Sequence, residues 1–232
     1  MIIKSILIPY HGSGINNLTS RIIDNTFVSK ITDHGAIILV WQRNKIPANF
    51  YVEIISMTTE RRLNIGGIEK TKSWEIFNIN PSDNTDHVGD AKDLSRFKNN
   101  SFIEIYASHV LEHIDYIDEL KSTLCEWYRV LKPKGRIYIS VPDLDTLCLL
   151  LTQKNNLSTE DEFDLMRMVY GGHIDSHDYH LVGFTQNILA EYLHISGFKN
   201  ITKVDSHKLF DDTSEKEFKG TKISLNITAT KD

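Results

Sequence analysis

The chain has 232 residues, of which 41% are hydrophobic and 25% are charged, a composition typical of a globular protein with a substantial core. A net charge of −5 without a basic stripe excludes broad electrostatic binding to nucleic acid. No apolar run approaches the roughly 18 residues needed to cross a bilayer, and no secretory leader pattern is present. We therefore expect a cytoplasmic protein without membrane insertion. Cys125 and Cys148 match no metal or disulfide spacing and are expected to be reduced core residues.

The first 60 residues predict short strands and little else. Three apolar runs have the length of strands, at 2–9, 36–41 and 50–57. Ile22, Ile23 and Phe27 could line one face of a helix. We expect an N-terminal extension that covers a pocket, extends a sheet or mediates a homodimer.

From residue 62 the pattern becomes regular. Strands are predicted at 63–65, 74–79, 88–90, 102–107 and 136–141. Before the last of them, apolar side chains recur at helical spacing, at Leu120, Leu124, Trp127 and Leu131. Strands that alternate with a helix in this way predict a parallel sheet with crossover connections.

The C-terminal part predicts two further helices and two strands. Ser158 and Asp161 have the spacing of a capping box, and Thr185 caps a helix that ends at Gly197. Strands are expected at about 199–204 and 222–230. In the last strand apolar and polar residues alternate, which predicts one buried and one wet face.

Four segments resemble, in order and spacing, the landmarks of class I S-adenosylmethionine (SAM)-dependent methyltransferases of the small methyltransferase-domain type. They are Arg-Leu-Asn-Ile-Gly-Gly at 62–67, Val-Gly-Asp-Ala at 88–91, Tyr-Ala-Ser-His-Val-Leu-Glu-His at 106–113 and Arg-Val-Leu-Lys-Pro-Lys-Gly at 129–135. Segments 168–173, 211–214 and 223–226 resemble a bacterial subgroup associated with surface-polysaccharide genes.

The resemblance implies an α/β fold with a Rossmann-like sheet, mostly parallel with an antiparallel C-terminal strand, in three α/β/α layers. We expect one domain over 1–232. Its parts are an N-terminal extension (1–60), a cofactor-binding core (61–145), a helix with a His- and Asp-rich lid (146–182) and a C-terminal helix with strands (183–232).

The resemblance also implies SAM as cofactor, bound at the carboxyl ends of the strands. The residues that it assigns are Asn64, Gly66, Gly67, Asn80, Asp90, Ala91, Ser108 and His109. Glycines would let the backbone approach the methionine part, Asn80 would bond the ribose hydroxyls and Asp90 the adenine amino group. A tight turn at the glycines and a turn or cap at Asp90 are the alternatives. Only two adjacent glycines are present, and Asn80 stands where the family usually has a carboxylate.

Methyl transfer to a hydroxyl is helped by a general base, a role that His suits near neutral pH. Catalytic roles are predicted for His109, His173, His180 and Asp175, and substrate contacts for His113, Asp143, His177, Asp178 and Tyr179. The alternatives are structural hydrogen bonds for His113, loop capping for Asp143 and a solvated loop over 173–180. His173 and His177 have the i, i+4 spacing of metal ligands, but we predict no metal site, and Mg²⁺ bound through Asp is an alternative.

The sequence thus predicts an enzyme that O-methylates a small acceptor, with a His general base. The subgroup resemblance suggests a sugar hydroxyl of a nucleotide-sugar or surface-polysaccharide precursor. The reduced glycine loop leaves open a non-catalytic binding subunit of the same fold. A nicotinamide-dependent enzyme is disfavoured because no GxGxxG pattern follows the strand.

Overall fold

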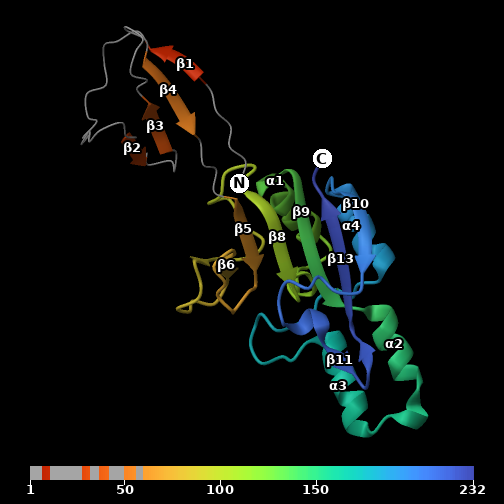
Figure 1. Ribbon diagram of the computed structural model, residues 1–232. Helices are drawn as coiled ribbons and strands as arrows, with labels where there is room; N and C mark the ends of the chain where they lie inside the picture. Colours follow the sequence, from red (N-terminus) through yellow and green to blue (C-terminus); the bar gives the residue numbers. More distant parts are fainter. Residues whose placement is uncertain (1–6, 11–27, 32–36, 42–49, 56–59) are drawn as a thin grey trace. The chain divides into compact units, whose positions relative to one another are not determined.

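The computed structural model describes residues 7–10, 28–31, 37–41, 50–55 and 60–232. The chain divides into two compact units, Met1–Glu60 and Arg61–Asp232, which are drawn in Figure 1. From the sequence, we expected residues 1–60 to form an extension of a single domain. The helical face expected at 22–27 lies outside the described residues.

The first unit contains a four-stranded antiparallel sheet. Its strands, in spatial order, are β1 (Leu7–Tyr10), β4 (Phe50–Ile55), β3 (Ile37–Trp41) and β2 (Val28–Ile31). The expected strands at 36–41 and 50–57 correspond to β3 and β4, and the one at 2–9 overlaps β1. β2 was not predicted, because four residues with Ser29 and Lys30 in their middle carry too short an apolar pattern.

The second unit is built on a seven-stranded sheet (Figure 1). Its strands are β5 (Arg61–Ile65), β6 (Glu75–Asn78), β7 (His87–Val88), β8 (Phe102–Ser108), β9 (Leu131–Pro142), β10 (Lys199–Val204) and β13 (Ser224–Thr230). The spatial order is β10-β13-β9-β8-β5-β6-β7, and only β13 runs antiparallel to its neighbours. The predicted fold class, a mostly parallel Rossmann-like sheet with an antiparallel C-terminal strand, is confirmed.

This strand order fixes where a ligand can bind. From β5 the chain moves outward to β6 and β7, and then returns to β8 on the other side of β5. The connections at the carboxyl ends of β5 and β8 therefore leave in opposite directions. In open α/β sheets, ligands bind in the crevice at such a switch point.

The two faces of this sheet differ in polarity. On one face Leu63, Ile105, Ile139 and Ile227 are at most 1% exposed and share a core cluster with residues of α1 and α4. The bounds of these helices are Leu120–Val130 for α1 and Gln186–Ile195 for α4. Within residues 61–232, α1 and α4 supply the α-helical part of this core cluster, and both pack on this apolar face. The third layer expected from the resemblance is therefore not helical here.

The opposite face is polar and carries a loop rather than helices. Asn226 of β13, expected on a wet face, is 1% exposed. Its side-chain amide donates to the carbonyl oxygens of Asp205 (3.3 Å) and Ser214 (3.1 Å) in the segment 205–218. The alternation predicted for the last strand is thus present, but hydrogen bonds replace water on its polar side.

The remaining elements lie beyond the carboxyl ends of the strands (Figure 1). They are η1 (Leu111–His113), α2 (Leu144–Thr152), η2 (Lys154–Asn156), α3 (Thr159–Tyr170), η3 (Thr213–Glu215), β11 (Glu217–Phe218) and β12 (Thr221–Lys222). α3 begins with the predicted capping box of Ser158 and Asp161. Of the helices in the described residues, none is long and apolar enough to span a bilayer.

The expectation for the cysteines was wrong in one respect. Cys125 on α1 and Cys148 on α2 are free thiols, as expected, but both are exposed. Cys125 follows Leu124, which belongs to the buried stripe, and so lies on the outer side of the helix. The position on an amphipathic helix decides exposure here, against the general tendency of cysteine to be buried.

Candidate functional site

The carboxyl ends of β5 to β8 enclose a cavity of about 490 Å³. Five of the eight predicted cofactor residues line it: Gly66, Asn80, Asp90, Ala91 and His109. The segment 174–179 forms part of its wall. Besides His109, which also has a predicted catalytic role, five of the residues assigned to the substrate and to catalysis line it: His113, Asp175, His177, Asp178 and Tyr179.

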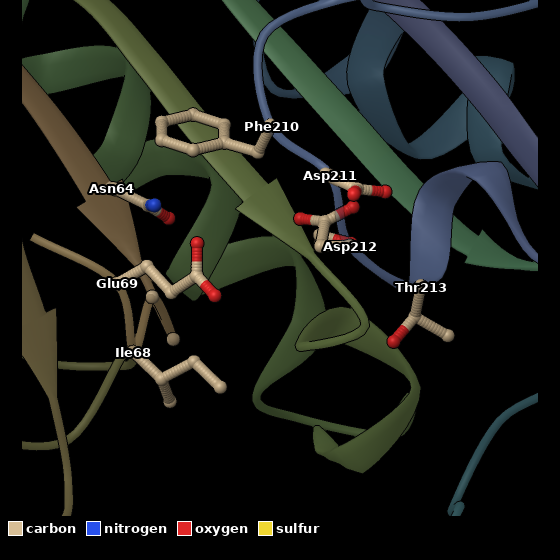
Figure 2. A pocket seen from close by; sticks show the side chains of 10 residues that line it. Asn64, Ile68, Glu69, Phe210, Asp211, Asp212 and Thr213 are labelled. Carbon is tan, nitrogen blue, oxygen red and sulfur yellow. The ribbon is translucent and has the colours of Figure 1, made fainter. Parts of the chain in front are cut away.

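A second cavity, of about 220 Å³, adjoins the first at Gly66, which lines both. It contains the other predicted cofactor residues, Asn64, Gly67 and Ser108. Its remaining lining residues were not among the predicted site residues; they are Ile68, Glu69, Phe210, Asp211, Asp212 and Thr213. Figure 2 shows this smaller cavity, with the side chain of Glu69 opposite those of Asp211 and Asp212.

The glycine turn after β5 is a tight turn and also a close-packed wall. Gly66 has a φ of +80°, and a Cβ there would lie 2.6 Å from Cγ2 of Val110. The Asn78 side-chain amide donates to the carbonyl oxygens of Gly66 (3.2 Å) and Gly67 (3.0 Å), which fastens the turn to the end of β6. Asn78 was missed, although an amide as the last residue of a strand is a signal for such a link.

The loop after β7 holds Asp90 at the larger cavity. Its Oδ1 accepts a hydrogen bond from the Lys92 backbone N–H at 2.9 Å, so the turn expected as an alternative is present at this residue. The side chain nevertheless remains exposed and lines the cavity. The fully buried Trp127 donates its Nε1–H to the Ala91 carbonyl oxygen at 2.8 Å, which anchors the loop to the core.

A buried carboxylate that the sequence analysis missed lies beneath the histidines. Glu112 is 1% exposed, and its Oε1 lies 3.0 Å from Nδ1 of His109. Burial would raise the pKa of Glu112, but the neighbouring His109 and His113 outweigh it and the pKa is lowered. Glu112 is therefore a carboxylate in the folded protein. No local sequence pattern predicts the burial of Glu112, because this burial results from the packing of η1 under the segment around residue 181.

His109 is held from both sides. Its Nε2 lies 3.0 Å from Oγ of Ser224, and that hydroxyl lies 2.9 Å from the carbonyl oxygen of Thr213. A hydroxyl has one proton to donate, so Ser224 donates either to the Thr213 carbonyl oxygen or to Nε2 of His109. In the neutral tautomer with the proton on Nδ1, facing Glu112, Nε2 of His109 is an acceptor.

The other predicted catalytic histidines do not reach either cavity. His173 stacks on Tyr179 with 4.0 Å between ring centroids, and its Nε2 lies 2.8 Å from the Tyr170 carbonyl oxygen. His180 packs edge-to-face on His113, at 4.9 Å between centroids, and burial lowers its pKa. Neither residue lines one of the two cavities.

Asp143 also lies away from both cavities. It is 5% exposed and is the N-cap of α2, and its Oδ2 lies 3.2 Å from Nζ of Lys203. Of its two sequence interpretations, the geometry provides the capping role.

The smaller cavity is acidic. Asp212 accepts hydrogen bonds from the Tyr106 hydroxyl (2.8 Å) and from the Ser214 backbone N–H (2.9 Å), which hold it in place. Burial, followed by the adjacent Asp212, raises the pKa of Tyr106, so this phenol stays a donor. Three carboxylates within one lining favour a ligand that presents hydroxyl or ammonium donors.

Part of the second unit matches a known protein family. Residues 70–139 match the family described as "Methyltransferase domain". No curated protein matches the sequence.

Solved structures with a similar fold include methyltransferases. About 74% of this chain aligns with 86% of a SAM-dependent methyltransferase from Archaeoglobus fulgidus, at 16% identity and a TM-score of 0.46. A SAM-dependent methyltransferase from Methanosarcina mazei aligns over 74% of this chain and 92% of its own, at 19% identity and a TM-score of 0.44. The CurJ carbon methyltransferase aligns over 73% of this chain and 48% of its own, at 15% identity and a TM-score of 0.43. Similarity at this level does not bear on substrate or mechanism.

Proposed function

We propose that residues 61–232 form a SAM-dependent methyltransferase that binds its cofactor in the larger cavity. The observation that carries the proposal is the convergence of Gly66, Asn80, Asp90 and His109, each from the end of a different strand, on one cavity. The methyltransferase-domain match at 70–139 covers three of the four. A cavity of about 490 Å³ is within the range of small-molecule sites.

The residues present fit the cofactor's parts. Gly66 presents backbone without a side chain at the wall of the cavity, so a ligand can approach it closely, and the exposed Asp90 carboxylate offers an acceptor for an amino group. Bound SAM would supply a methyl group on a sulfonium, which leaves as a neutral thioether.

We propose a polyhydroxylated acceptor, a sugar, in the smaller cavity. Glu69 and Asp211 can accept hydrogen bonds from hydroxyls, and the ring of Phe210 offers an apolar face for a pyranose. The Ser108 Oγ is buried and has no hydrogen-bond partner among the described residues, so it is available to the acceptor. A nucleotide-linked or surface-polysaccharide precursor is the source suggested by the subgroup resemblance.

The general base that we propose is His109. It would exchange its bond to Ser224 for one to the acceptor hydroxyl and take the proton at Nε2. The imidazolium so formed is stabilised by Glu112, 3.0 Å from Nδ1. Methyl transfer would form an O–C bond at the acceptor as the S–C bond of the methyl donor breaks, and His109 would receive the hydroxyl proton at Nε2.

A second candidate follows from the same three carboxylates. An acidic cavity also favours a cationic amine, so the acceptor atom could be nitrogen instead of oxygen. The two candidates differ in whether an amino sugar is methylated in preference to the matching neutral sugar.

The experiment is methyl transfer from isotope-labelled SAM to paired acceptors, a neutral sugar nucleotide, its deoxy analogue and its amino analogue, read by mass spectrometry. O-methylation predicts product with the neutral sugar and none with the deoxy analogue. His109→Gln should lower kcat by at least about 100-fold, while exposed His194→Ala on α4 leaves it unchanged. Cofactor binding without turnover on any acceptor would favour the non-catalytic binding subunit. A kcat of His109→Gln within tenfold of wild type would show that His109 is not the general base.

A further inference from the structure

Three side chains that could ligate a metal ion meet beside the larger cavity. A carboxylate oxygen of Glu112 and one ring nitrogen each of His113 and His180 lie within 4.8 Å of one another. Glu112 and His113 belong to η1, directly after β8, whereas His180 comes from the lid segment. This set differs from the His173 and His177 pair whose spacing the sequence suggested.

Both histidines are oriented as metal ligands usually are. Nδ1 of His113 lies 3.1 Å from the Tyr179 carbonyl oxygen, and Nδ1 of His180 lies 3.1 Å from the Met168 carbonyl oxygen. A carbonyl accepts only from N–H, so the proton of each neutral ring is on Nδ1. Nε2 of each ring is then a free lone pair. Metal-bound histidines almost always donate their other N–H to such an outer partner.

The third group is a buried carboxylate with spare acceptor capacity. Glu112 is 1% exposed, and neither of its oxygens accepts a hydrogen bond of standard geometry from the described residues. His109 Nδ1 is within ion-pairing distance of Oε1, which leaves Oε2 without a cationic neighbour at that range. A buried carboxylate oxygen in this state is costly unless a proton, a donor or a metal ion satisfies it.

We propose that Glu112, His113 and His180 bind one divalent transition-metal ion of the zinc class. Two imidazoles and one carboxylate form a known ligand set for such ions, and three protein ligands leave a coordination position open. Metal–ligand distances of about 2.0–2.2 Å require the three atoms to approach by roughly 1 Å.

The site would link the lid to the sheet. The backbone already joins them, since the N–H groups of Leu181 (2.7 Å) and Val182 (3.3 Å) donate to the Glu112 carbonyl oxygen. A metal ion held by His180 would fix the segment 174–179 that walls the cavity. The proposal does not depend on the methyltransferase assignment, because it rests on these three side chains alone.

The test uses full-length protein with its affinity tag removed, purified without chelator. Elemental analysis gives the metal content, and Co²⁺ titration of the metal-free protein, read by visible absorption, gives affinity and ligand field. The variants are His180→Ala and Glu112→Gln, with His177→Ala as the matched lid control. Circular dichroism verifies the fold of each variant, and calorimetry with S-adenosylhomocysteine (SAH) is run with and without metal.

We expect about one zinc or similar ion per chain, and Co²⁺ binding that weakens at least about tenfold in His180→Ala and Glu112→Gln but not in His177→Ala. The proposal is overturned if folded wild-type protein binds no transition metal at micromolar Co²⁺ or Zn²⁺. It is equally overturned if the two ligand variants bind as well as wild type, or if binding needs His177 and not His180. If the metal-free protein still binds SAH, failure of the metal proposal leaves the proposed function intact.

Discussion

Replacement of Gly66 by alanine tests the geometry of the wall that the two cavities share. A Cβ at this position would lie 2.6 Å from Cγ2 of Val110, and the residue has a φ of +80°. Gly220 offers a matched control, since its φ is also +80° and a Cβ there would meet nothing within 4 Å. Both substitutions reduce the freedom of the unfolded chain equally, so that effect cancels between them.

The expected losses of stability follow from the positive φ and from the contact with Val110. The left-handed backbone costs a non-glycine residue roughly 1–2 kcal/mol, which is all that Gly220→Ala should lose. Forcing a methyl group into a filled space typically costs about 1–3 kcal/mol more. We therefore expect Gly66→Ala to lower the free energy of unfolding by about 2–5 kcal/mol and to weaken SAH binding, with binding unchanged in Gly220→Ala.

Urea unfolding, followed by tryptophan fluorescence with the fully buried Trp127 as the main reporter, gives the stabilities. Calorimetry with SAH gives the affinities. If Gly66→Ala costs no more than Gly220→Ala and binds SAH normally, the turn after β5 does not form the wall described here, and the reasoning fails.

Three further predictions concern residues of the second unit. Burial lowers the pKa of His207 below its ordinary 6.5, so the neutral residue favours the folded state above that pH, and this contribution to the free energy of unfolding is lost as the pH falls, by at most about 1.4 kcal/mol per pH unit. In urea unfolding at several pH values, His207→Asn should therefore lose less stability than wild type between pH 7 and 5. Equal losses in the two proteins would contradict this. Asp143→Ala should lower the free energy of unfolding by about 1 kcal/mol, because the N-cap of α2 is lost, whereas Asp143→Asn should stay close to wild type in the same assay. Loss of turnover without loss of stability would instead favour a substrate contact. Trp127→Phe removes the donor to the Ala91 carbonyl oxygen. It should lower the free energy of unfolding by about 1–3 kcal/mol and speed hydrogen exchange in the loop after β7. Unchanged exchange would show that this hydrogen bond does not anchor the loop.

The sequence predicted elements whose pattern is local. The buried stripe of α1, the capping box of α3 and the strand ends at Gly66 and Asp90 depend on residues within a few positions of one another. Their period and turn chemistry sufficed to place the cofactor residues at one edge of the sheet.

What the sequence left unpredicted depends on distant contacts or on patterns without a period. α2 is apolar on nearly all sides (Leu-Asp-Thr-Leu-Cys-Leu-Leu-Leu-Thr), so no amphipathic stripe marks it, and only its cap at Asp143 does. The burial of Glu112 requires a lid about 70 positions further along the chain. The acidic cavity joins Glu69 to Asp211 and Asp212, which no local rule could associate.

The central claim, a SAM site in the larger cavity, is tested most directly by calorimetric titration of SAH into wild type, Asp90→Ala and Asp93→Ala. Asp93 is the control because its carboxylate accepts from the Ser95 N–H at 2.8 Å and lines neither cavity. We expect one SAH per chain, an affinity about 10–100-fold weaker in Asp90→Ala from the loss of a charged hydrogen bond, and no change in Asp93→Ala. Folded wild-type protein that binds no SAH at millimolar ligand, or an Asp90→Ala affinity equal to wild type, would contradict it.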